Sequence, residues 1–168
     1  MFDLIEKKKW IPLVGRLMLA FSSIEEITYD ILKYWTNDIC FTRLRKLSLS
    51  ERIKLLIELS NVQKCCLENK EYLQNYLHEL YTFIQYRNLI AHNQVSLVLY
   101  NNEDKETVFK EAIISNEDTF KTVEYNDLKK IVPKVEALEE SILKVFLKIK
   151  IENFDFDLIS KFKGLDGY

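Results

Sequence analysis

The chain has 168 residues, of which 48% are hydrophobic and 30% charged, with only 3 Gly and 2 Pro. This composition predicts one helical domain over residues 1–168 and excludes a disordered or loop-built chain. The formal net charge of −2 excludes recruitment of nucleic acid by a global basic field, so an RNA ligand needs a local site.

The cysteines and the apolar stretches indicate the compartment. Cys40, Cys65 and Cys66 are odd in number and lack C-x-x-C spacing, which favours reduced and mostly packing thiols of a cytoplasmic protein. The longest apolar stretch, residues 10–24, is interrupted by an arginine and two serines and is followed by two glutamates. It is typical neither of a membrane span nor of a signal peptide, so we expect no membrane partner.

The first predicted element is a helix from about Ile11 to Trp35, with apolar residues three and four apart and Pro12 in its first turn. A short segment over residues 39–47 follows a polar break. The sequence Ser48-Leu49-Ser50-Glu51 has capping-box spacing and opens the next helix. A further helix runs from about Glu71 to Ala91.

The hydrophobic period then changes from that of a helix to that of a strand. Residues 95–100 and 107–114 are rich in residues that favour β-strands, and each run ends in a polar turn sequence. In residues 119–124, apolar and polar residues alternate weakly. Helical spacing resumes at about Asn126 and continues to Ile149, with Pro133 either kinking this helix or marking its true start.

These patterns predict a mainly α fold class. We expect an up-and-down bundle of four to five helices, with a small β-hairpin or meander at about residues 95–124 inserted before the last long helix. The apolar tail at about residues 151–168 is expected either to dock on the bundle or to be flexible.

One positive charge falls where a helix should be apolar. With Arg87 at zero on a helical wheel of about 100° per residue, Leu80 and Ile84 lie close beside it on the apolar arc. Asn88 and His92 lie at about 100° and 140°, on the rim of that arc.

A negative charge is placed in a similar way on the first helix, where Glu25 lies at the edge of the apolar face and Glu26 lies on the solvent side. Burying either Arg87 or Glu25 alone costs free energy, so each needs a partner or a function. One interpretation is a structural Arg87–Glu25 salt bridge that only fixes the register of the helices.

The neighbours of Arg87 favour a functional site. A histidine transfers protons near neutral pH, an arginine fork holds a phosphate, and Asn88 can orient either group. This set suits metal-independent phosphodiester cleavage without a cofactor, because two histidines and scattered carboxylates do not favour a metal site. His78 lies about 180° from Arg87 on the wheel, so it is expected to face solvent without a function.

At these residues the chain resembles the HEPN superfamily, whose signature is an arginine, commonly followed by a polar residue, and then a histidine after a short spacing. Here the motif is Arg87-Asn88-Leu89-Ile90-Ala91-His92, at the end of an amphipathic helix. The segment Phe21-Ser22-Ser23-Ile24-Glu25 and the β insertion after the histidine are similar to a bacterial branch of that superfamily. The resemblance covers residues 10–149.

The resemblance implies a homodimer in which two Arg–His motifs meet in a composite active site. It further implies a metal-independent RNase of toxin–antitoxin or phage-defence type, with RNA as substrate and an antitoxin or defence protein as partner. Arg87 would hold the scissile phosphate, His92 would transfer the 2′-hydroxyl or leaving-group proton, Asn88 would position either group, and Glu25 would orient Arg87. The products would be a 2′,3′-cyclic phosphate and a 5′-hydroxyl.

One departure from the family matters, because a branch of it carries a tyrosine, modified by the antitoxin, where this chain has Gln94. That form of control is therefore not expected here. Two other functions stay open: a non-catalytic dimerisation module, in which the Arg–His cluster is a polar lock, and a module that binds nucleotides or RNA.

Overall fold

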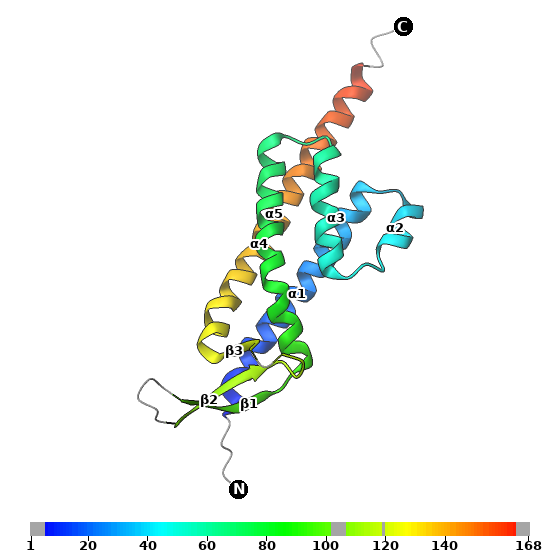
Figure 1. Ribbon diagram of the computed structural model, residues 1–168. Helices are drawn as coiled ribbons and strands as arrows, with labels where there is room; N and C mark the ends of the chain where they lie inside the picture. Colours follow the sequence, from blue (N-terminus) through cyan, green and yellow to red (C-terminus); the bar gives the residue numbers. More distant parts are fainter. Residues whose placement is uncertain (1–5, 102–106, 119, 164–168) are drawn as a thin grey trace. The chain divides into compact units, whose positions relative to one another are not determined.

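The computed structural model describes residues 6–101, 107–118 and 120–163, with only the backbone described at residues 100–101, 107–108 and 154–163 (Figure 1). The described elements, in chain order, are α1 (Lys7–Trp35), α2 (Asp38–Leu44), α3 (Leu49–Val62), α4 (Leu67–His92), β1 (Val95–Asn101), β2 (Thr107–Ile114), β3 (Thr122–Glu124) and α5 (Tyr125–Lys163). The expected fold class is confirmed: helices predominate, and a small antiparallel sheet is inserted before the last long helix.

Three helices extend beyond their predicted ends, and one of them, α4, begins at Leu67 and not at about Glu71. α1 begins at Lys7, so Pro12 lies inside the helix and not in its first turn. α5 begins eight residues before Pro133, which therefore does not mark its start, and it continues through residues 151–163 of the expected tail. No glycine or proline occurs between residue 150 and Gly164 to end that helix earlier. Residues 164–168 lie outside the described part of the chain.

The chain forms two compact units. Unit 1 consists of Met1–Ser22 and Phe83–Ala137, and unit 2 consists of Ser23–Thr82 and Leu138–Tyr168. α1, α4 and α5 each contribute residues to both units. The motif residues of α4 and the whole sheet belong to unit 1, whereas Glu25 belongs to unit 2.

Unit 1 contains the sheet, whose strand order is β1-β2-β3, with Val95 paired to Ile113 and Asn101 paired to Thr107. The buried apolar residues of this unit come from α1, the end of α4, the sheet and the start of α5: Trp10, Leu17, Ala20, Phe21, Phe83, Ile84, Ile90, Ala112, Ile113, Val123, Leu128, Ile131, Val132 and Val135. The core of unit 1 therefore holds the end of α4 against the sheet.

A single carboxylate fastens the start of α1 to β2. Glu111 accepts hydrogen bonds from the backbone N–H of Glu6 (2.7 Å) and from Trp10 Nε1 (2.8 Å), and it pairs with Lys9 Nζ (2.8 Å). Burial opposes ionisation of this carboxyl, but the hydrogen bonds from Lys9, Trp10 and Glu6 outweigh burial and lower its pKa to about 2. This contact between distant parts of the sequence explains why α1 starts earlier than its apolar pattern predicts.

Unit 2 contains α2, α3 and the larger part of α4. The predicted capping box is confirmed at α3, where Ser48 Oγ accepts from the N–H of Glu51 and the Glu51 carboxylate accepts from the N–H of Ser48. His78 is exposed, as predicted. The cysteines form no disulfide, but Cys40 and Cys66 are exposed, so the prediction that they are packing residues is wrong for those two thiols.

Unit 2 also buries a charge that the helical pattern does not reveal. Arg52, at the start of α3, has a relative exposure of 1%. Its guanidinium donates to the carbonyl oxygens of Glu25 (3.0 Å) and Leu47 (3.1 Å) and to Thr28 Oγ1 (2.9 Å), and its carbon atom lies 3.4 Å from the Tyr29 ring centroid. Burial lowers the pKa of Arg52, and this set of acceptors and the ring compensate the buried cation.

The Glu111 contacts predict a pH-dependent contribution to stability. The pKa of this carboxyl falls from 4.5 to about 2 on folding, so its stabilisation is complete above 4.5 and is lost as the pH falls toward about 2. We expect Glu111→Gln to lower the free energy of unfolding by about 1–3 kcal/mol at pH 7. Urea unfolding should show this difference shrinking below pH 4.5. Glu26→Gln, at an exposed position, is the control and should show no such pH dependence.

Candidate functional site

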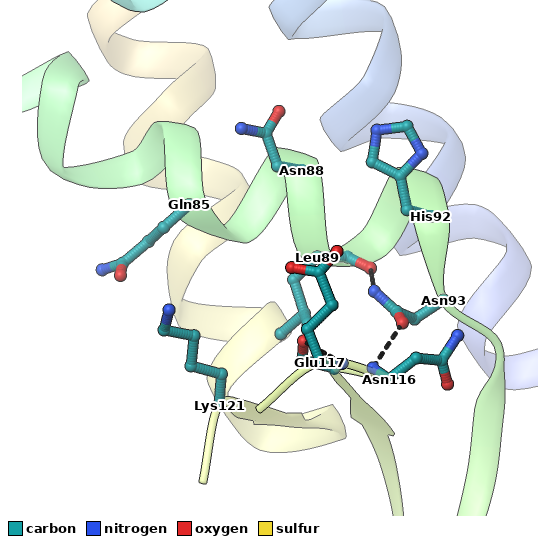
Figure 2. A pocket seen from close by; sticks show the side chains of 9 residues that line it. Gln85, Asn88, Leu89, His92, Asn93, Asn116, Glu117 and Lys121 are labelled. Carbon is teal, nitrogen blue, oxygen red and sulfur yellow. Dashed lines mark hydrogen bonds between the residues drawn. The ribbon is translucent and has the colours of Figure 1, made fainter. Parts of the chain in front are cut away.

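Unit 1 contains a pocket of about 430 Å³ beside the end of α4 (Figure 2). One of its walls comes from the last turns of α4 and the other from the turn that joins β2 to β3. The lining residues are Gln85, Asn88, Leu89, His92, Asn93, Ser115, Asn116, Glu117 and Lys121. Eight of these nine side chains are polar or charged, which suits a polar ligand.

The α4 wall is one face of the helix. Gln85, Asn88, Leu89 and His92 are spaced at i, i+3, i+4 and i+7, so their side chains lie in one stripe. Asn88 and His92 are both exposed, in agreement with their predicted position on the rim of the apolar arc. The structure therefore brings two of the four predicted site residues into one pocket.

The second wall is a turn that is held by its own hydrogen bonds. Ser115 Oγ accepts from the N–H groups of Glu117 and Asp118 (3.2 Å each), and the N–H of Ser115 donates to the carbonyl of Lys121 (3.0 Å). Lys121 Nζ lies 3.5 Å from Asp118 Oδ2. Figure 2 shows the Glu117 and Lys121 side chains extending from this turn toward α4.

Asn93 joins the two walls directly. Its Nδ2 donates to the carbonyl of Leu89 (2.8 Å), and its Oδ1 accepts from the backbone N–H of Asn116 (3.0 Å), as the dashed lines in Figure 2 show. One amide side chain therefore terminates α4 and fixes the position of the β2–β3 turn relative to it.

Arg87 does not line this pocket. It is half-buried, and its Nη1 donates to Asn88 Oδ1 (3.2 Å). On the helical wheel the lining stripe lies about 100–200° away from Arg87, which explains why the guanidinium contacts the pocket residue Asn88 and not the pocket itself. The role of Arg87 as the group that holds the scissile phosphate stays a prediction.

Glu25 belongs to unit 2 and is half-buried, while Glu26 is exposed, as the wheel predicts. The backbone carbonyl of Glu25 accepts from Arg52 Nη1 (3.0 Å) and from Thr28 Oγ1 (2.8 Å). The pairing of the Glu25 side chain with Arg87, and its role in orienting that arginine, stay predictions. Ala91, which lies at about 40° from Arg87 on the helical wheel, is exposed near the end of α4.

The turn residues of the second wall are not among the predicted site residues. The signal that locates them is the antiparallel hairpin: β1 starts just after His92, so β2 must return to the same place before the chain turns at Ser115. Glu117 and Lys121 thus come to line the same pocket as His92 only through the register of the sheet.

The pocket combines an imidazole, a carboxylate, an ammonium group and amides. The ammonium and the amide donors can bind an anionic oxygen, while the imidazole and the carboxylate can give or take protons. Within the described ranges, no group of three or more His, Cys, Asp or Glu residues is arranged to hold a metal ion.

Comparison of the chain with models of protein families, with curated proteins and with solved structures finds no match. Among the described residues, no helix combines the length and apolarity that a bilayer span needs.

We expect Asn93→Ala to loosen the β2–β3 turn. The substitution removes both hydrogen bonds of the amide and should lower the free energy of unfolding by about 1–2 kcal/mol. Hydrogen–deuterium exchange should become faster at the amide of Asn116, which Asn93 Oδ1 protects. Asn116→Ala is the matched control, because Asn116 contributes its backbone N–H and keeps it in the variant. Equal exchange in the two variants would contradict the role of Asn93.

Proposed function

We propose that this protein is a metal-independent endoribonuclease of toxin or phage-defence type. It cleaves RNA by attack of a 2′-hydroxyl on the adjacent phosphate, giving a 2′,3′-cyclic phosphate and a 5′-hydroxyl. The observation that carries the proposal is that His92 and Asn88 line one polar pocket together with Lys121.

The chemistry of this reaction matches the pocket. Attack by the 2′-hydroxyl needs a group that transfers a proton and a positive charge near the phosphate, where negative charge develops. His92 supplies the first and Lys121 the second, and both line the same pocket of about 430 Å³. A pocket of that volume lies within the ordinary range for small-ligand sites and accommodates a nucleotide unit.

The resemblance to the HEPN superfamily supports the same conclusion. The Arg87–His92 motif ends α4, and the β insertion follows it directly, which is the arrangement that the resemblance implies. In this proposal Arg87 positions Asn88 through their hydrogen bond and contacts the scissile phosphate when RNA is bound. Glu25 orients Arg87.

The proposal includes the partners that the resemblance implies. Two copies of the chain form a homodimer that places their motifs at a shared cleft, RNA is the substrate, and an antitoxin or a defence protein controls the activity. The proposed location is the cytoplasm.

The hydrogen bond between Arg87 and Asn88 favours a second candidate function, a non-catalytic dimerisation or RNA-binding module. A half-buried guanidinium that donates to a neighbouring amide can act as a polar lock at a helical interface. This function requires no proton transfer by His92, so the two candidates differ in their response to substitution of that residue.

We expect purified protein to cleave total RNA in the presence of EDTA. His92→Ala should lower the cleavage rate by about 100-fold or more, because it removes the group that transfers the proton. His78→Ala is the matched control, since His78 is exposed and lies outside the pocket. Intact RNA at high concentrations of the wild-type protein would refute the proposed activity, and binding of RNA under those conditions would favour the binding module.

Substitution of Arg87 separates the two candidates further. If the protein is a nuclease, Arg87→Ala should slow single-turnover cleavage by about 10-fold or more while leaving the oligomeric state unchanged. If the arginine is only a polar lock, the same variant should dissociate in sedimentation equilibrium and should melt at a lower temperature. Arg87→Lys retains the charge but not the planar fork. If the protein is a nuclease, the cleavage rate of this variant should lie between the rates of the wild type and of Arg87→Ala.

A further inference from the structure

We propose that the free edge of β1 binds an extended segment of another protein, which carries alternate apolar residues and an acidic residue. The segment adds a fourth strand to the sheet and places an apolar side chain in a groove beside Val95. This inference goes beyond the proposed nuclease function and does not rest on it, because the binding surface contains neither His92 nor Arg87.

β1 is an edge strand whose backbone is open to a further strand (Figure 1). The strand order is β1-β2-β3, so within the described part of the chain β1 pairs with a strand on one side only. Its seven residues, Val95–Asn101, pair with β2 in one continuous register without a bulge. In an antiparallel pair every second residue directs its N–H and C=O away from the partner strand. These groups of β1 are therefore available to an added strand.

This edge lacks the features that normally keep an edge strand from pairing. Val95–Asn101 includes no charged residue, no proline and no glycine. None of the side chains from Val95 to Leu99 is buried, whereas Ala112 and Ile113 of β2 are fully or almost fully buried. A long, uncharged edge strand of this kind is a template for pairing with another chain.

An apolar groove of about 530 Å³ lies beside the start of β1, within unit 1. One wall is a stripe of α1 spaced at i, i+3, i+4 and i+7, with a glycine next to it, and the other is the end of α4 with the start of the sheet. The lining residues are Lys7, Trp10, Ile11, Val14, Gly15, Ile90, Asn93, Gln94, Val95 and Ile113. A Cβ atom at Gly15 would have no neighbour within 4 Å beyond its own part of the helix, so the groove is open at that point.

The groove and the edge lie where one added strand can use both. Val95 and Ile113 are paired, so their side chains lie on the same face of the sheet, and both line the groove. Alternate side chains of a strand added to β1 would lie on this same face. Main-chain hydrogen bonds to β1 would then supply affinity, and the fit of an apolar side chain in the groove would supply specificity.

The charges at the groove indicate what else the segment carries. Lys7 lines the groove, and Lys8 beside it is exposed. Within the described residues neither lysine forms an ion pair, and no acidic residue is among those that line the groove. A carboxylate on the segment complements this charge. Antiparallel pairs are the commoner kind, and an antiparallel segment brings its C-terminal end to the start of β1, so we expect the carboxylate near that end.

The first experiment selects binders from a library of random octapeptides displayed on phage. We expect enriched sequences that alternate apolar residues and carry an aspartate or glutamate near the C-terminal end. Ile11→Glu should weaken binding of these peptides by about 10-fold or more, because it adds a like charge to the groove. Leu19→Glu is the matched control, since Leu19 is also exposed on α1 (73%, against 65% for Ile11) but lies outside the groove. Failure to enrich any peptide that Ile11→Glu loses would overturn the inference.

The second experiment tests the backbone pairing, with a synthetic copy of the most enriched peptide. Calorimetry compares this peptide after N-methylation at one set of alternate residues and at the other set. Methylation of the set whose N–H groups face β1 should weaken binding by about 10-fold or more, while methylation of the other set should have little effect. Equal effects of the two sets would contradict strand addition.

The charge at Lys7 is tested by reversing it. Lys7→Glu should weaken binding of the acidic peptide, and a peptide with lysine in place of its carboxylate residue should bind this variant better than it binds the wild type. Lys130→Glu, at an exposed position outside the groove, is the control. Unchanged binding of both peptides to Lys7→Glu would remove the acidic residue from the proposed segment. Thermal melting identifies any loss of folding, which is not expected because Lys7 and Ile11 are exposed.

A second copy of the chain is the competing occupant of the edge. We expect Leu99→Lys, which places a charge on β1, to leave the oligomeric state in sedimentation velocity unchanged. An oligomer that Leu99→Lys dissociates and Leu19→Lys does not would assign the edge to a second copy and overturn the inference. All these measurements are made without RNA. A failed cleavage assay therefore leaves this inference in place, and failed peptide binding leaves the proposed nuclease function in place.

Discussion

The candidate site depends on the pairing of β1 with β2. Val95, just beyond the end of α4, pairs with Ile113. The antiparallel strand β2 therefore ends close to the point where β1 begins, beside the end of α4. A slip of one residue would transfer the side chains of β2 to the opposite face of the sheet. Ile113 is buried, and Glu111, two residues before it, is nearly buried. Their burial fixes the register that places the β2–β3 turn beside the end of α4.

The charged groups of this protein fall into two classes. Glu111 and Arg52 are enclosed by donors and acceptors from distant parts of the sequence, and each connects elements of its own unit. Lys121 and Glu117 lie exposed on a turn, where a ligand can reach them. A charge that is held by partners within the fold is not accessible to a ligand, so the exposed class is the one that a ligand in the pocket could contact.

The sequence predicts the helices and strands well where a periodic pattern determines them, and β2 has its predicted ends. It also predicts that Asn88 and His92 lie on one rim of α4, because that follows from helical spacing alone. The early start of α1 depends on Glu111, and the burial of Arg52 depends on backbone acceptors, so neither is visible in a local pattern. The sequence pattern likewise does not predict the turn wall of the pocket, because only the register of the strands brings that turn to α4.

The two walls of the pocket differ in how freely evolution can alter them. The α4 wall is part of a long helix whose apolar face is buried, so packing constrains the position of the helix although Asn88 and His92 are exposed. The β2–β3 turn is held by hydrogen bonds of its own and by one amide of Asn93, and surface turns accept changes of sequence and length. A change of sequence or length in this short turn would therefore alter one wall of the pocket, while His92 and the bundle that supports it remain the same.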